Sequence, residues 1–95
     1  MSLEASPKQI LEFAIERSLM VSTAYNRGRS ILAPHSLFAR HDELYLRAVT
    51  VERDGRRPRE ARLGTFKLIG LGDLALTGRT FDRDSLFAPL EAMAS

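Results

Sequence analysis

The sequence contains no cysteine among its 95 residues. This absence excludes disulfides, thiolate metal sites and cysteine nucleophiles, and it fits a reducing cytoplasm, where we expect the protein to reside. Long apolar runs are also missing, since none approaches the roughly 20 residues that a membrane-spanning helix needs. The first residues lack the basic start and apolar block of a secretory signal. We therefore expect no membrane partner.

Charge of one sign is not in large excess. The sequence contains fourteen lysines and arginines and twelve acidic residues, which gives a formal net charge of +2. Hydrophobic residues make up 44% and charged residues 27% of the chain, which is typical of a globular protein. The length suffices for one modest core, so residues 1–95 are expected to form a single domain.

The chain begins with the signature of a helix. In the segment SPKQILEFAIERS, Ser6 can cap the helix, Pro7 suits its first position and Gln9 completes a capping box. The helical spacing of the next residues predicts one stripe along the helix, with Leu11 beside it. The stripe consists of Ile10, Phe13, Ala14 and Arg17.

From Met20 the hydrophobic period changes to two. Short segments with strand character follow one another, separated by turn signals around Gly28, residues 40–43 and Asp54-Gly55. Pro34 predicts an edge strand or a bulge, because proline cannot donate to a ladder. Residues 82–95 read as a short helix that Pro89 interrupts or restarts. We predict an α+β, mainly β fold, in which the N-terminal helix packs on a strongly bent five-stranded sheet or barrel and a short C-terminal helix follows.

Several segments between Ile10 and about Phe81 form a recognisable series. They lie in the order ILEFAIERS, a strand ending at Tyr25, RSILAPHSL, LYLRA, an arginine-rich hairpin, RLGTF and GRTF. Together they resemble the WYL domain family. The resemblance implies an Sm-like or SH3-like small β-barrel over residues 7–81. It also implies a ligand-sensing domain of bacterial transcription regulators, which in some members binds single-stranded nucleic acid.

The sequence departs from the family pattern at three positions. Leu44 replaces the tryptophan that gives the family its name. Ser30 stands where an arginine is usual, with Arg29 one position away, and Thr65 stands where a second arginine is expected. These changes leave open whether the family's anionic-ligand site is abolished or only altered.

Tyr45 and Arg47 form the first candidate site, because residues two apart in a strand face the same side. They could provide a stacking ring beside a cation for a base or a phosphate. The alternative is an ordinary structural pair, with the arginine stem lying on the ring. Tyr25, at a strand end, could pack its ring and present its hydroxyl to a ligand or to a backbone partner.

The remaining candidate residues follow from the resemblance and from charge. The segment RDGRRPREAR forms the predicted hairpin tip and is dense in arginine, which binds phosphates bidentately. Arginine-rich hairpin tips are, however, more often solvated turns. From this segment we retain Arg62, which we place within a strand. His35 follows Pro34 and matches a frequent family dipeptide. The predicted ligand-binding set is therefore Tyr25, Arg29, His35, Tyr45, Arg47 and Arg62.

Enzymatic interpretations find little support. His35 and Ser36 are adjacent in a predicted strand and should point to opposite faces, so they cannot act as base and nucleophile. His41, Asp42 and Glu43 are consecutive turn residues, which seldom converge on one metal ion. We predict no catalytic residue, no metal and no cofactor. The remaining rival is a protein-interaction or homo-oligomerisation module, because small barrels with open edges readily add a strand.

Overall fold

The computed structural model describes residues 6–82. The elements follow in the order α1 (Pro7–Arg17), β1 (Leu19–Tyr25), β2 (Gly28–Arg40), β3 (Glu43–Arg53), β4 (Leu63–Lys67), the single-turn 3-10 helix η1 (Leu68–Gly70) and β5 (Gly72–Thr80). One antiparallel sheet contains all five strands in the order β4-β3-β2-β1-β5. This arrangement confirms the predicted α+β, mainly β class. The helix predicted over residues 82–95 lies outside the described residues, apart from Asp82 itself.

Helix α1 begins as the sequence predicts. The Ser6 hydroxyl accepts a hydrogen bond from the Gln9 amide at 3.2 Å, and the Gln9 side chain accepts one from the Ser6 amide at 2.9 Å. The predicted apolar stripe is displaced around the helix, because Leu11 and Ala14 are buried while Phe13 is 41% exposed. The Arg17 guanidinium lies over the Phe13 ring on this outer side. The helix therefore packs through Leu11 and Ala14 rather than through Phe13.

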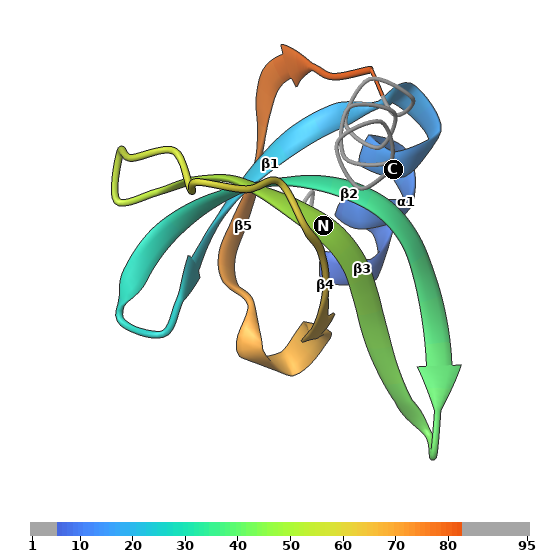
Figure 1. Ribbon diagram of the computed structural model, residues 1–95. Helices are drawn as coiled ribbons and strands as arrows, with labels where there is room; N and C mark the ends of the chain where they lie inside the picture. Colours follow the sequence, from blue (N-terminus) through green and yellow to red (C-terminus); the bar gives the residue numbers. More distant parts are fainter. Residues whose placement is uncertain (1–5, 83–95) are drawn as a thin grey trace, which may run out of the picture.

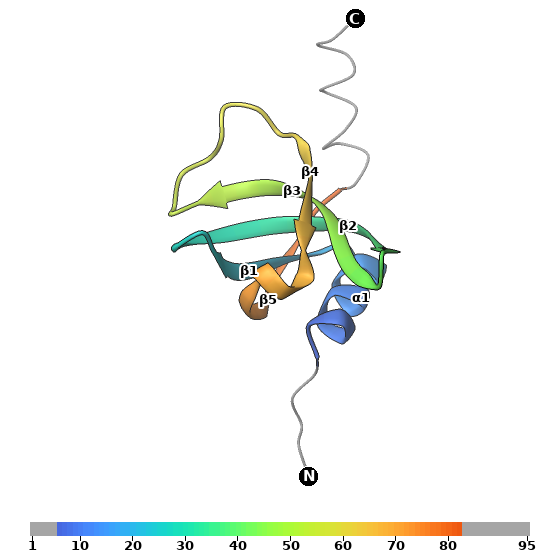
Figure 2. The same cartoon turned by 90° about the horizontal axis from the view of Figure 1, so that it is seen from below.

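The five strands form a curled sheet, with α1 lying on one side of it (Figures 1 and 2). The two edge strands, β4 and β5, are joined by η1, so the chain passes from one edge of the sheet to the other (Figure 1). The core lies between α1, η1 and the facing side of the strands. Its buried members are Leu11, Ala14, Val21, Leu32, Leu46, Ala48, Leu68 and Leu71. Within residues 6–82 no helix is long and apolar enough to cross a bilayer.

A bulge and a two-residue turn shape the long hairpin of β2 and β3. The pairing shifts between Pro34 and Ser36, which makes His35 the extra residue of a bulge. Of the two alternatives for Pro34, the bulge is correct and the edge strand is wrong, since β2 is the central strand. The hairpin turns at His41 and Asp42, whose positive φ angles of 51° and 63° are those of a two-residue turn.

The chain after β3 does not form the simple hairpin that Asp54-Gly55 predicts. A tight turn is present, because the amides of Arg53 and Arg56 each donate to the other's carbonyl. However, residues 57–62 then leave the ladder, and β4 begins only at Leu63, opposite Val49. Our placement of Arg62 within a strand is therefore wrong. Pro58, which has no amide hydrogen to donate, lies in this excursion.

Candidate functional site

Tyr45 and Arg47 lie on the same face of β3, on the side opposite to the buried Leu46. Phe38 of β2 lies directly across from Tyr45, and the two rings stack with centroids 5.3 Å apart and planes 15° apart. The Arg47 guanidinium carbon lies 5.1 Å from the centre of the Phe38 ring. These three side chains form a surface cluster that we call the aromatic–arginine face.

The Tyr45 hydroxyl already has a protein partner. It donates to a Glu43 carboxylate oxygen at 3.1 Å, and the Lys67 ammonium lies 3.4 Å from the same oxygen. Lys67 is the β4 residue opposite Tyr45, so a row of Phe38, Tyr45 and Lys67 crosses three neighbouring strands. The tyrosine therefore offers its ring, rather than its hydroxyl, to any ligand on this face.

Arg47 is the cation of the face that remains available. Its side chain is exposed, and it takes part in none of the ion pairs found within residues 6–82. Lys67, by contrast, is already paired with Glu43. Guanidinium groups stay charged at all relevant pH values and bind carboxylates or phosphates through two parallel hydrogen bonds. The face thus combines two aromatic rings with one uncommitted guanidinium.

Tyr25 and Arg29 occupy a different region. The Tyr25 ring packs edge-on against Phe66, with centroids 5.3 Å apart, and it borders the core. Arg29 lies 3.9 Å from Asp73 of β5 in an exposed ion pair. Arg29 and Phe38 are nine residues apart along β2, which corresponds to about 30 Å of strand. A small ligand on the aromatic–arginine face would therefore not reach Arg29.

His35 and Arg62 do not join the face either. His35 is only 4% exposed, and its ring lies 5.3 Å from that of Phe81. Arg62 is exposed in the segment before β4 and is paired with Glu60 at 2.7 Å. Of the six predicted ligand residues, the structure brings together only Tyr45 and Arg47. The other four residues lie at different positions along the strands or in a loop, so they do not contribute to this face.

Sequence reasoning missed Phe38 and Lys67. A usable signal existed for Phe38, because a two-residue turn at His41 and Asp42 places it directly opposite Tyr45. No comparable signal existed for Lys67, whose position depends on where β4 resumes after the excursion of residues 57–62.

The two positions at which the sequence resemblance predicts an arginine lie in different environments. Ser30 is 3% exposed, opposite Thr23 of β1 and Arg53 of β3. Thr65 is exposed on β4, directly opposite Arg47. A basic side chain at residue 65 would therefore lie beside the aromatic–arginine face.

The arrangement of His35 and Ser36 matches the expectation from strand alternation. His35 is buried whereas Ser36 is exposed, as adjacent strand residues on opposite faces would be. His41 and Asp42 form a turn, and residues 6–82 contain no group of three or more side chains placed to hold a metal ion.

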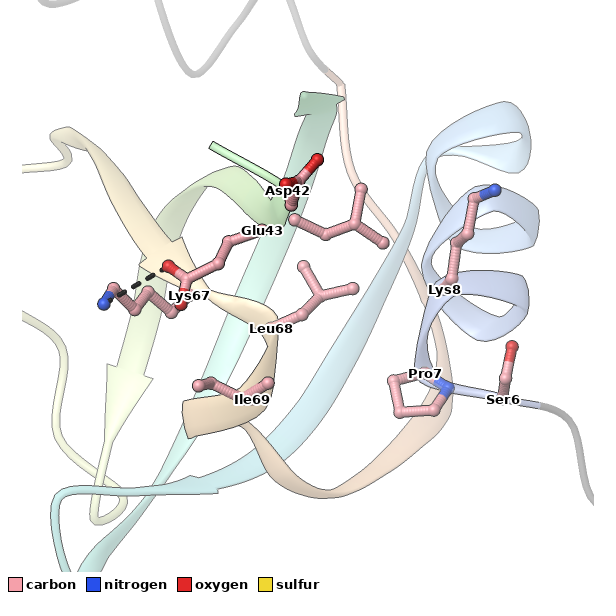
Figure 3. A pocket seen from close by; sticks show the side chains of 9 residues that line it. Ser6, Pro7, Lys8, Asp42, Glu43, Lys67, Leu68 and Ile69 are labelled. Atoms are coloured by element: carbon pink, nitrogen blue, oxygen red, sulfur yellow. Dashed lines mark ion pairs between the residues drawn. The ribbon is translucent and has the colours of Figure 1, made fainter. Parts of the chain in front are cut away.

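A separate pocket of about 380 Å³ lies between the first turn of α1, the start of β3 and η1. Figure 3 shows Pro7 and Lys8 on one side of it, Leu68 and Ile69 on the other, and Asp42 at its rim. Glu43 and Lys67 also line this pocket, and their ion pair connects its rim to Tyr45.

A comparison with models of known protein families gives no match, and a comparison with curated proteins gives none either.

Proposed function

We propose that this chain is a WYL-like ligand-sensing domain of a bacterial transcription regulator or of an accessory protein in the cytoplasm. The ligand is an anion, either single-stranded nucleic acid or a nucleotide. Two features support the fold assignment. A leading helix precedes five antiparallel strands, and the last strand returns to pair with the first, an order compatible with an Sm-like or SH3-like barrel.

The arrangement of Arg47 over Phe38, next to the stacked Tyr45, carries the functional proposal. Single-strand binding proteins combine aromatic platforms with cations, because every base has a π face and every nucleotide a phosphate. In the proposed mode Arg47 binds a phosphate while a base packs on the exposed parts of the two rings. Binding would then alter how the domain assembles with partners, since the output of such a sensor is a change in contacts.

The test is a fluorescence-anisotropy titration with a labelled single-stranded thymidine decamer, repeated across a salt series. We expect the affinity to fall steeply between about 50 and about 200 mM salt, because each phosphate contact releases counterions. Arg47→Gln should weaken binding severalfold. It should also reduce by about one the slope of the logarithm of the binding constant against the logarithm of the salt concentration, which we call the salt slope. Tyr45→Ala should weaken binding with less effect on the slope, because it removes a ring and no charge.

Arg59→Gln is the matched control, since it removes the same charge from an exposed position in residues 57–62. It should leave binding nearly unchanged. Equal losses in Arg47→Gln and Arg59→Gln would instead indicate general attraction to a basic protein and would refute the proposed site. Circular dichroism of each variant verifies that the fold is retained.

The second candidate function is a homo-oligomerisation or protein-interaction module. The observation that favours it is the pair of edge strands, because β4 and β5 each pair on one side only. Unpaired edges can accept a further strand from another chain. Assembly in light scattering, together with no decamer binding at low salt, would favour this function over the first.

A further inference from the structure

The pocket between α1, β3 and η1 has an apolar interior that the proposed nucleic-acid face does not use. Its apolar walls are Pro7 from the helix start, Leu44 from β3, and Leu68 and Ile69 from η1. Ile69 is 85% exposed, the highest value among the large hydrophobic side chains of residues 6–82. A volume of about 380 Å³ falls within the range of small-ligand pockets, roughly 300 to 1,000 Å³.

The charges at the rim of this pocket are mostly paired. Glu43 is paired with Lys67 at 3.4 Å, and Lys8 lies 4.0 Å from Glu12 of the next helical turn. Asp42 is the exception, because its carboxylate takes part in no ion pair or hydrogen bond found between residues 6 and 82. The pocket thus presents one uncommitted negative charge beside an apolar interior.

The backbone fixes where that carboxylate lies. Asp42 is the second residue of the two-residue turn between β2 and β3, with a φ of 63°. Two residues later in the chain, Leu44 of β3 forms part of the pocket wall. Because the turn has two residues and the pairing beside it is regular, with Arg40 opposite Glu43 and Ala39 opposite Leu44, the charge and the apolar wall keep a nearly constant separation. A ligand with matching spacing can therefore contact both at once.

We propose that this pocket binds a small apolar amine, meaning a molecule with one ring or branched aliphatic group and one ammonium. The apolar group occupies the space between Pro7, Leu44, Leu68 and Ile69, and the ammonium lies at Asp42. The site is separate from the aromatic–arginine face and prefers the opposite ligand charge. The two sites share the Glu43–Lys67 ion pair at their boundary.

The experiment is an NMR titration of the ¹⁵N-labelled chain with three probes that share a phenyl ring, namely phenethylamine, 2-phenylethanol and 3-phenylpropionate. We expect the amide signals of Leu44, Leu68 and Ile69 to shift, with affinity falling from the amine to the alcohol to the acid. Asp42→Asn should reduce the affinity for the amine about two- to fivefold, to the level of the alcohol, as expected for an exposed ion pair. Asparagine tolerates the positive φ of this position, so the turn should persist.

A second variant tests the apolar wall. Ile69→Ser removes an exposed side chain of the pocket and should weaken all three probes without unfolding the protein. Leu76→Ser is its control, because Leu76 is 43% exposed on β5 and does not line the pocket. The proposal is overturned if the pocket amides do not shift, if the acid binds as tightly as the amine, or if Asp42→Asn leaves the order of the probes unchanged. Loss of decamer binding in the earlier test would not affect these outcomes.

Discussion

Arg29 and Asp54 are joined by two hydrogen bonds. The Asp54 amide donates to the Arg29 carbonyl at 2.7 Å, and the Arg29 amide donates to the Asp54 carboxylate at 2.9 Å. These two hydrogen bonds connect the start of β2 to the turn that follows β3, where the chain leaves the ladder. The Arg53 guanidinium adds a contact to the Asn26 carbonyl in the β1–β2 turn. Two turns that are distant in sequence therefore support each other.

We expect Asp54→Ala to lower the free energy of unfolding by about 2 kcal/mol. The change removes a hydrogen bond and places alanine at a φ of 50°, which asparagine and aspartate tolerate better. Asp54→Asn keeps an acceptor and the backbone preference, so its effect should be much smaller. Urea unfolding measures both variants, with Glu60→Ala as an exposed control. Equal stability of Asp54→Ala and Asp54→Asn would show that the side-chain bond contributes nothing.

Gly28 is expected to resist substitution because of the same aspartate. A Cβ at residue 28 would lie 2.9 Å from both Asp54 carboxylate oxygens, closer than van der Waals contact allows. We predict that Gly28→Ala destabilises the protein by about 1 to 2 kcal/mol by displacing that side chain. In an Asp54→Gly background the same change should be nearly neutral. A double-mutant cycle by urea unfolding measures this coupling, and strictly additive effects would contradict it.

The fold was predictable from the sequence where local rules are sufficient. Ser6 and Gln9 identified the helix start, and Pro34 predicted an edge strand or a bulge, of which the bulge is present in β2. The buried side of α1 was harder to predict, because Phe13 and Leu11 are both apolar and lie on different sides of the helix. Only packing against the strands selected Leu11. Such choices depend on partners that are distant in sequence.

The candidate site shows the same division between local and distant information. Strand alternation correctly placed Tyr45 and Arg47 on one face, because that rule needs only two neighbouring positions. Placing Arg62 required the start of β4. Pro58 indicated a break in the ladder, but nothing in the arginine-rich segment indicated that the break would continue over six residues to Leu63. Uniting Arg29 with Tyr45 and Arg47 in one surface ignored the length of β2, because Arg29 lies at its start and the other two pair with its second half.

The centre of β3 should be the most sensitive part of the core. Leu46 is fully buried and packs in the cluster that includes Leu11 and Leu32. We predict that Leu46→Ala lowers the free energy of unfolding by about 2 to 5 kcal/mol, because it removes buried apolar surface and leaves a cavity. Leu63→Ala is the matched control on β4, where the side chain is 40% exposed and a smaller loss is expected. Chemical denaturation of both variants measures the difference, and similar losses would count against the core assignment.

Tyr45 allows the ring and the hydroxyl to be tested separately. Tyr45→Phe removes only the hydrogen bond to Glu43, which keeps its ion pair with Lys67. We therefore expect Tyr45→Phe to change stability by less than about 1 kcal/mol and to bind the thymidine decamer like the unchanged protein. Tyr45→Ala should weaken binding, because it removes the ring. If Tyr45→Phe binds as poorly as Tyr45→Ala, the hydroxyl rather than the ring contacts the nucleic acid.

Thr65→Arg should strengthen binding of the decamer. Residue 65 is exposed and lies directly opposite Arg47, so the new side chain would add a second guanidinium beside Arg47. Two like charges across a strand pair repel, which should cost a few tenths of a kcal/mol in stability. A bound phosphate relieves that repulsion, and the salt slope should become steeper by about one. Thr80→Arg, which adds the same charge at the exposed end of β5, should bind like the unchanged protein. Equal gains from both variants would mean that total charge, rather than the geometry around Arg47, governs binding.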